Sequence, residues 1–313
     1  MASSPTTTAS RCSANSTRPP ERRAVAARSA LARKPRDFAD AADRLSPADF
    51  RRLTAHIHAV CGITISQAKS EMLEGRLRRR VRALGLDSLR DYAAWLFEGG
   101  ALDEEGPALI NAVTTNKTDF FREPAHFAFL REVVLPELSQ RRRPLRVWSA
   151  ACSTGAEPYT LAMVLDAHAN DADGPEFGIL ATDIDTEVLA HARRGVYPLA
   201  QLDPVPAELR RRYVMRARLA GRNEGRITPD LRAAVGFGRL NLIGEGYPVG
   251  EPMDVIFCRN VLIYFDRETQ ARVVAQLADC LRPGGYLFLG HSEAGVGASP
   301  ALASVACAVY RKH

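Results

Sequence analysis

The chain has 313 residues, a length that allows one large domain or two modest ones with real hydrophobic cores. Hydrophobic residues make up 46% and charged residues 25% of the sequence, which excludes a wholly disordered, collagenous or fibrous protein. Residues 1–36 hold eight basic side chains and one acidic one, and the rest of the chain holds 34 basic and 35 acidic side chains. The net charge of +6 therefore belongs to the start of the chain. Because the remainder is nearly neutral, no nucleic acid is expected as a partner.

Residues 1–37 form a basic tail that is rich in Ser, Thr, Ala and Arg and has no apolar periodicity. Such a segment cannot recover the entropy lost on ordering, so we expect it to be disordered. An acid-poor, Arg-rich start is also typical of organellar transit peptides, and this alternative stays open.

Residues 38–106 have helical periodicity and predict a small all-α domain of three or four helices. The first helix is expected to begin behind the N-cap Ser46. The second has an apolar stripe, and Arg76, Arg79 and Arg80 lie on its remaining surface. This surface is either a solvated basic face or a docking surface for an acidic partner.

The connection at residues 107–143 contains NAVTTNKTDFFREPAHF, which concentrates Asn, Thr, Arg and aromatic residues in one short piece. Asn116, Thr118 and Arg122 follow one another at steps of two and four residues and can converge on a polar or carboxylate group. A capped helix entry explains the same residues equally well.

From residue 144 onward, apolar runs alternate with helical patterns, which predicts a doubly wound, mostly parallel sheet of the α/β class. Strands are expected at LRVWSA, FGILATDID, VGFGRLNL, MDVIFCRN, YLFLGH and near SVACAVYRK, with a turn at LRPGGY. The segment at about 197–232 interrupts this rhythm and is too long for a plain connection. It predicts an inserted subdomain with a small antiparallel element.

Ligands bind at the carboxyl ends of the strands in such a sheet. The first strand leads to Gly155 without the two further glycines of a dinucleotide fingerprint, so NAD and FAD are disfavoured. Glu157 is either a ligand or an acid that complements the helix macrodipole. Asp183 ends the second strand, where an acid accepts hydrogen bonds from ribose hydroxyls, while Asp185 fits a helix N-cap. A ribose-binding acid without a phosphate loop indicates S-adenosylmethionine.

The fourth strand ends in CRNVLIY, which lacks the two prolines of nucleobase amine methylases. Cys258 has no evident base beside it, so we interpret it as a buried strand cysteine. The six cysteines form no CxxC pair and have no zinc spacing, so neither disulfides nor a metal are expected. No apolar run reaches membrane-spanning length, and a cytoplasmic location is expected.

Together these strings resemble the chemotaxis receptor glutamate O-methyltransferases, the CheR family. The resemblance rests on TNKTDFFRE followed by His126 and Phe127, and on VWSAACSTGAEPYTLA, ATDIDTEVLAHARRGVY, LNL at residues 240–242 and FCRNVLIYFD. It runs from about Ser46 to Tyr310. It implies a class I S-adenosylmethionine-dependent methyltransferase, a Rossmann-like doubly wound sheet with a small N-terminal all-α domain and an inserted β-subdomain.

The resemblance also implies roles for individual residues. The residues that match the cofactor contacts of the family are Asn116, Thr118, Arg122, Glu157, Asp183, Asn241, Leu242, Arg259 and Asn260. Tyr264 matches a tyrosine near the transferred methyl group, and we expect Arg122 and Tyr264 to be catalytic. Ala156 departs from the family, in which an acid is frequent at that position, whereas the neighbouring Glu157 is retained.

The implied function is methyl transfer from S-adenosylmethionine to glutamate side chains on the cytoplasmic helical bundle of methyl-accepting chemoreceptors, with S-adenosylhomocysteine as the product and no metal. Arg76, Arg79 and Arg80 are the expected receptor-binding residues, and the chain is expected to act as a monomer. Two alternatives are a sensory adaptor that binds the cofactor without turnover and a nucleic-acid methyltransferase.

Overall fold

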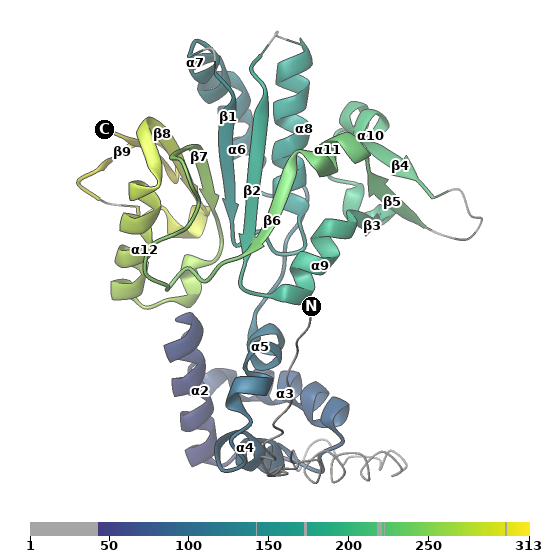
Figure 1. The fold of residues 1–313 in the computed structure, drawn as a ribbon, viewed down its shortest axis with the longest axis vertical. Helices are drawn as coiled ribbons and strands as arrows, with labels where there is room; N and C mark the ends of the chain where they lie inside the picture. Colours follow the sequence, from purple (N-terminus) through teal and green to yellow (C-terminus); the bar gives the residue numbers. More distant parts are fainter. Residues whose placement is uncertain (1–42, 142, 172–173, 218–220, 222, 298) are drawn as a thin grey trace, which may run out of the picture.

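The computed structural model describes residues 43–141, 143–171, 174–217, 221, 223–297 and 299–313. A small helical domain is stacked against one end of a larger α/β domain along the long axis of the molecule (Figure 1). The basic tail predicted at residues 1–37 lies outside the described residues.

The helical domain is built from four α-helices and one 3₁₀ turn within the described residues. These elements are α2 (Pro47–Cys61), η1 (Gln67–Lys69), α3 (Ser70–Leu84), α4 (Leu89–Phe97) and α5 (Leu102–Val113). Ser46 caps α2 as predicted, because its hydroxyl accepts a hydrogen bond from Asp49 N at 3.1 Å. The stripe of α3 is buried at Leu73, Leu77 and Val81.

The last helix of this domain continues past the predicted boundary at residue 106. Pro107 lies inside α5, and the helix ends only at Val113. Leu109, Ile110 and Val113 are buried in the core of the helical domain. Burial of this apolar face outweighs the local cost of the proline, which is why propensity alone placed the boundary too early.

The main sheet combines five parallel strands with a C-terminal antiparallel hairpin, in the order β6-β2-β1-β7-β8-β10-β9. Its strands are β1 (Leu145–Ala150), β2 (Phe177–Asp183), β6 (Val235–Arg239), β7 (Met253–Cys258), β8 (Leu281–Leu289), β9 (Leu302–Ala306) and β10 (Val309–Lys312). The strand order reverses between β1 and β7, and ligands bind at such a switch point.

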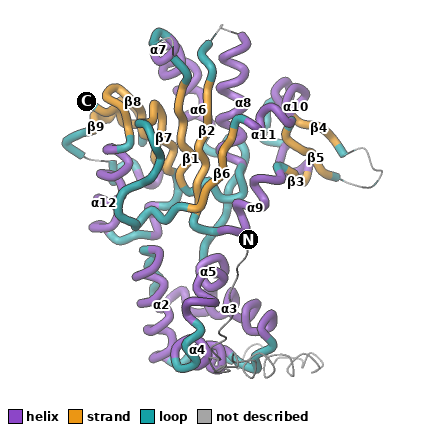
Figure 2. The backbone as a smooth tube through the Cα atoms, viewed as in Figure 1, coloured by secondary structure: helices purple, strands orange, loops and turns teal. Residues whose placement is uncertain are grey.

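Helices flank the main sheet on both sides (Figure 2). They are α6 (Pro124–Phe129), the π-helical turn η2 (Leu130–Val134), α7 (Leu135–Ser139), α8 (Ala156–Asp171), α9 (Thr186–Arg194) and α12 (Arg267–Asp279). Alternate residues of β7 enter opposite cores, with Val255 and Phe257 on one face and Ile256 and Cys258 on the other. Cys258 is fully buried, in agreement with its interpretation as a strand cysteine.

Two predicted boundaries in this sheet are wrong. The LRPGGY segment is part of β8, which pairs with β7 from Leu281 and continues after a register shift near Gly284, whose φ is 72°. The strand expected near SVACAVYRK is a hairpin, because Ala308 at φ 54° reverses the chain between β9 and β10. Left-handed φ values at single residues leave no trace in apolar periodicity.

A small antiparallel sheet of order β3-β5-β4 is inserted between α9 and β6. Its strands are β3 (Val196–Pro198), β4 (Val214–Arg216) and β5 (Glu224–Ile227), accompanied by η3 (Leu199–Leu202), α10 (Ala207–Tyr213) and α11 (Pro229–Ala233). The predicted inserted subdomain is therefore present. None of the helices among the described residues has the length and apolar character of a membrane span.

Candidate functional site

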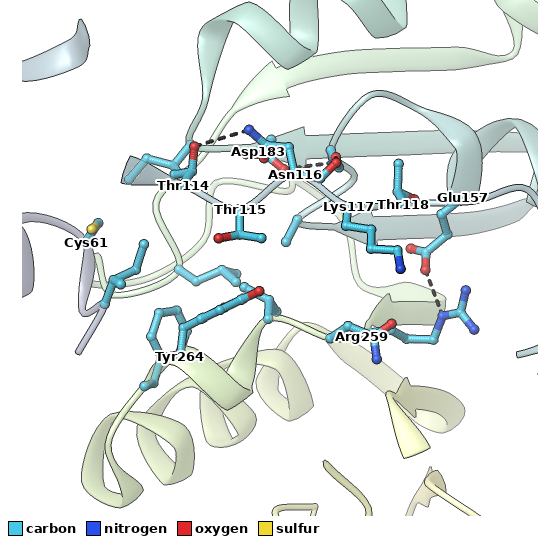
Figure 3. A pocket seen from close by; sticks show the side chains of 18 of the residues that line it. Cys61, Thr114, Thr115, Asn116, Lys117, Thr118, Glu157, Asp183, Arg259 and Tyr264 are labelled. Carbon is cyan, nitrogen blue, oxygen red and sulfur yellow. Dashed lines mark hydrogen bonds and ion pairs between the residues drawn. The ribbon is translucent and has the colours of Figure 1, made fainter. Parts of the chain in front are cut away.

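A pocket lies at the carboxyl ends of β1, β2 and β7, where they face the chain after α2 and after α5 (Figure 3). The space between its lining side chains is about 860 Å³, a volume that includes open solvent at its mouth. Every residue that the sequence analysis assigns to the cofactor or to catalysis lines this pocket: Asn116, Thr118, Arg122, Glu157, Asp183, Asn241, Leu242, Arg259, Asn260 and Tyr264.

Three residues in the pocket wall have a left-handed backbone conformation. The φ angles are 58° at Ala151, 51° at Ser153 and 59° at Asn260. A non-glycine residue in this region costs on the order of 1 to 3 kcal/mol. Such strain persists only where the surroundings impose it, and its concentration around one pocket is typical of a functional site.

Asp183 is buried at the end of β2 and is held by the backbone. Its Oδ2 accepts a hydrogen bond from Ser153 N at 2.8 Å, and its Oδ1 accepts one from Asp185 N at 3.0 Å. Burial raises the pKa of Asp183, and these backbone N–H groups oppose the shift. Because a carboxylate has about four acceptor positions, Asp183 keeps capacity for a ligand's hydroxyl groups.

Asp185 caps α9 as predicted and also fixes the segment after α5. Its Oδ1 accepts hydrogen bonds from two backbone N–H groups in the first turn of α9. Its Oδ2 accepts hydrogen bonds from Thr114 Oγ1 at 2.9 Å and Asn116 Nδ2 at 2.7 Å. The carbonyl of Asn116 in turn accepts a hydrogen bond from Ser153 Oγ at 3.0 Å. Asn116 therefore has a positioning role in the pocket wall besides the ligand contact predicted for it.

Glu157 and Arg259 form a buried ion pair across the pocket floor (Figure 3). Arg259 Nε donates to Glu157 Oε2 at 2.7 Å, and Ser149 Oγ donates to Glu157 Oε1 at 2.7 Å. Glu157 is thus the partner of a buried cation. Neither of its two predicted roles, a ligand contact or an acid that complements the helix macrodipole, included this ion pair. The pair joins the first turn of α8 to the end of β7.

The second edge of the Arg259 guanidinium faces the segment before α6. Its Nη1 donates to the carbonyl of Arg122 at 2.7 Å, and lies 3.2 Å from His126 Nδ1 and 3.5 Å from Glu123 Oε2. Burial and then the Arg259 charge lower the pKa of His126 to about 4, so this imidazole is neutral at pH 7. Glu123, His126 and His291 hold potential metal-ligand atoms within 4.8 Å of one another, but the guanidinium already supplies a cation there.

The helical domain contributes one wall of the pocket. Cys61 and Ile63 line it from the end of α2 and the following loop. Asn241 Nδ2 donates to the carbonyl of Val60 at 2.6 Å, and Thr64 N donates to the carbonyl of Tyr264 at 2.9 Å. These contributions could not be predicted from the sequence, because no local pattern records how two domains dock.

Two cationic side chains and one phenol line the open part of the pocket. Lys117 is exposed and its ammonium points toward the pocket interior, as does the Tyr264 ring (Figure 3). Arg122 is half-buried, and its Nη1 donates to the carbonyl of Lys117 at 3.0 Å. Lys117 lies between two residues that the sequence analysis selected, Asn116 and Thr118, and that position is the signal that could have identified it.

The three arginines predicted to bind a receptor lie outside this pocket, in an adjoining groove between α3 and α9. Arg80 makes a bidentate ion pair with the buried Glu105, at 2.7 and 2.8 Å, and Arg76 donates to the carbonyls of Val113 and Thr114. Both are thus structural residues of the helical domain. Arg79 is exposed and remains the better candidate for contact with a partner.

Comparison with known families decides the relationship. The model described as "CheR methyltransferase, SAM binding domain" matches residues 116–310, and that described as "CheR methyltransferase, all-alpha domain" matches residues 48–114. The chain belongs to the CheR methyltransferase family. The predicted family, fold class and S-adenosylmethionine cofactor are confirmed, and the roles of single residues stay predictions. The adaptor and nucleic-acid alternatives gain no support.

Curated relatives of this CheR chain extend over most of its length. It is 41% identical over 262 residues to chemotaxis protein methyltransferase 2 of Pseudomonas aeruginosa, and the alignment covers 84% of this chain and 92% of that relative. It is 44% identical over 251 residues to the chemotaxis protein methyltransferase of Salmonella typhimurium, and the alignment covers 80% of this chain and 84% of that relative. The Escherichia coli chemotaxis protein methyltransferase is 43% identical over 251 residues, and the alignment covers 80% of this chain and 85% of that relative.

Proposed function

We propose that this CheR protein transfers a methyl group from S-adenosylmethionine to glutamate side chains on the cytoplasmic helical bundle of a chemoreceptor, forming glutamyl methyl esters. The observation that carries the proposal is a pocket in which the buried acid Asp183 and the cations Lys117 and Arg122 line one space without a phosphate-binding loop. The names of its relatives, chemotaxis protein methyltransferases, support a receptor as the acceptor.

The pocket chemistry fits S-adenosylmethionine, a nucleoside with an amino-acid arm. Asp183 has acceptor capacity for the two ribose hydroxyls. Ile184, Leu240 and Leu242 supply apolar surface for the adenine. Arg122 presents a planar cation that suits the carboxylate of the arm. When bound, the cofactor supplies an electrophilic methyl group on a sulfonium centre.

The protein's contribution to this reaction is alignment and exclusion of water. A glutamate carboxylate titrates near 4.3, so the acceptor is already an anion at neutral pH and no general base is needed. Opposite charges are neutralised as the ester forms, which favours a site with few water molecules around the reacting atoms. We propose that Arg122 and Tyr264 orient the charged groups at this reacting centre. We propose that Arg79 makes the first contact with an acidic receptor surface.

The test is methyl transfer from S-adenosylmethionine labelled on its methyl group to receptor-containing membranes. A glutamyl ester releases labelled methanol in mild base, and removal of residues 1–36 should not change the yield. A receptor variant with Gln at the modified positions should accept no label, because a neutral amide is a far poorer nucleophile. Base-stable label, or label retained on RNA, would contradict the proposal.

A further inference from the structure

The segment from Asn260 to Tyr264 leaves the end of β7 and supplies three residues of the pocket wall, Asn260, Val261 and Tyr264. Asn260 has a left-handed φ of 59°, and the segment then makes only the single 3₁₀ turn η4 (Leu262–Tyr264). A turn of this length does not hold itself, because nucleation of a helical turn is unfavourable. Its conformation must be imposed from outside.

Glu293 supplies that support from η5 (His291–Glu293), directly after β8. Its Oε2 accepts a hydrogen bond from Asn260 N at 2.8 Å, and its Oε1 accepts one from Ile263 N at 3.3 Å. Gly290 N donates to the same Oε2 at 2.7 Å. One carboxylate therefore ties the beginning and the middle of the segment to the end of β8.

The close approach at Gly290 shows how tightly this contact is built. A Cβ on Gly290 would lie 2.5 Å from Asn260 Nδ2 and 2.8 Å from Glu293 Oε2, so no larger residue fits without a shift. Glu293 is 1% exposed and does not line the pocket. Its position excludes direct contact with a ligand in the pocket, although it fixes residues that line it.

A second carboxylate holds the side chain of the same asparagine. Glu123 Oε1 accepts a hydrogen bond from Asn260 Nδ2 at 3.1 Å, and Glu123 Oε2 lies 3.5 Å from Arg259 Nη1. Glu123 is itself left-handed, with φ 58°. The main chain and the side chain of Asn260 are thus fixed by two acids from two different segments.

The electrostatic cost of Glu293 indicates a purpose beyond packing. Burial raises its pKa, and backbone N–H groups from Asn260, Gly290 and Ile263 counteract the shift. A buried carboxylate is expensive to desolvate, but an apolar side chain in its place would leave three backbone N–H groups without this acceptor. Glu293 therefore has a geometric task, which is to hold donors from two segments at fixed positions.

We propose that Glu293 is a positioning residue for methyl transfer, which fixes the Asn260–Tyr264 segment so that Tyr264 is aligned in the pocket. This inference rests on the function proposed above, in which Tyr264 orders charge at the reacting centre. Misplacement of a catalytic group by about 1 Å can cost up to roughly a hundredfold in rate, so loosening the segment has a measurable effect.

The decisive variant is Glu293→Gln, because the amide keeps the shape of the side chain and turns one acceptor oxygen into a donor. That donor then faces a backbone N–H group, either at Asn260 or at Ile263. We expect kcat to fall about tenfold or more, with rates normalised to the fraction of protein that binds S-adenosylhomocysteine. In a Tyr264→Phe background the same change should cost about threefold or less, because the group being aligned is already gone.

A matched control is Glu137→Gln. Glu137 is also a structural carboxylate, and it accepts a hydrogen bond at 2.6 Å from Tyr286, which pairs with Val255 and so precedes the carboxyl ends of β7 and β8. The Glu137→Gln substitution should lower the midpoint of thermal unfolding without changing kcat. If Glu293→Gln does not fold, Glu123→Gln replaces it in the cycle, since Glu123 is only partly buried and holds the same asparagine.

Fluorine NMR of protein labelled with 3-fluorotyrosine separates this inference from the proposed function. The Tyr264 signal is assigned by its loss in Tyr264→Phe, and it should shift or broaden in Glu293→Gln but not in Glu137→Gln. An unchanged signal, or equal losses of kcat in the two backgrounds, overturns the positioning role. A Tyr264→Phe protein with full activity overturns instead the catalytic role of Tyr264, and the NMR result still decides whether Glu293 orders the segment.

Discussion

The buried pair of Glu157 and Arg259 allows a quantitative test of how the pocket floor is held. Only 10% of the Glu157 side chain and 2% of the Arg259 side chain are exposed, and their atoms are 2.7 Å apart. Glu157→Gln keeps the shape and one hydrogen bond but removes the charge. Among the residues that the structure describes, the Arg259 cation then keeps an ion pair only with Glu123, at 3.5 Å.

The magnitude follows from these contacts. Removing one partner of a buried ion pair costs about 3 to 5 kcal/mol, and a charge-assisted hydrogen bond contributes about 1.5 to 3 kcal/mol. Because the amide preserves part of the bonding, we expect Glu157→Gln to lower the free energy of unfolding by about 2 to 3 kcal/mol. Arg259→Met should cost more, since it also loses the hydrogen bond to the Arg122 carbonyl.

The assay is urea unfolding, monitored by circular dichroism, of the wild type, the two single variants and the double variant. The double variant should be more stable than the sum of the single changes predicts, with a coupling energy of about 2 kcal/mol. Glu132→Gln is the control, because Glu132 makes an exposed ion pair with Arg131, and it should change stability by less than about 1 kcal/mol. A coupling energy below about 0.5 kcal/mol would refute the reasoning.

Three further predictions concern the ligand, the partner surface and pH. Asp183→Ala should weaken cofactor binding roughly 30-fold or more by calorimetry, because two charge-assisted hydrogen bonds are lost, and unchanged affinity would refute the ribose role. Arg79→Glu should slow receptor methylation mainly below about 0.1 M salt. Arg80→Glu should instead lower the midpoint of thermal unfolding, because Glu105 loses its cationic partner. Equal effects of the two variants on both assays would argue against this division. The pKa of His126 is lowered to about 4 in the folded state, so protonation of this imidazole favours the unfolded state. The free energy of unfolding should therefore fall by roughly 3 kcal/mol as the pH drops from about 6.5 to 4. In His126→Gln the fall should be less steep.

Sequence reasoning located the pocket because of a general property of parallel sheets. Apolar runs define β1, β2 and β7, and their carboxyl ends meet at one edge regardless of the helices between them. Asp183 could therefore be assigned to the ligand site from the chain alone. Family resemblance added Asn241, Leu242, Arg259 and Asn260, to which the local pattern gave no such role.

The contacts that hold the pocket together could not be predicted in the same way. Glu157 was recognised as an acid at a helix start, but its partner Arg259 lies 102 positions away. Glu293 follows β8 just as Asp183 ends β2, and this position at a strand end was the available signal. What the sequence does not record is that its carboxylate turns back toward Asn260 rather than into the pocket.

The arginines of α3 show a limit of another kind. A helical projection separates buried from outward-facing residues, and it correctly buried Leu77 while leaving Arg79 outside. It cannot reveal that a neighbouring helix presents Glu105 to Arg80, because that contact depends on the packing of α5. Surface arginines identified by periodicity alone therefore include structural ones.

The most direct test of a carboxylate acceptor is the single-turnover rate of methyl transfer at saturating cofactor and receptor, measured across pH. A glutamate with a pKa near 4.3 is fully ionised throughout the neutral range, so no proton has to be removed during the reaction. The rate should be nearly constant between about pH 6 and 8.5. A first-order rise with pH over that interval would show a titrating base or acceptor and would contradict the account.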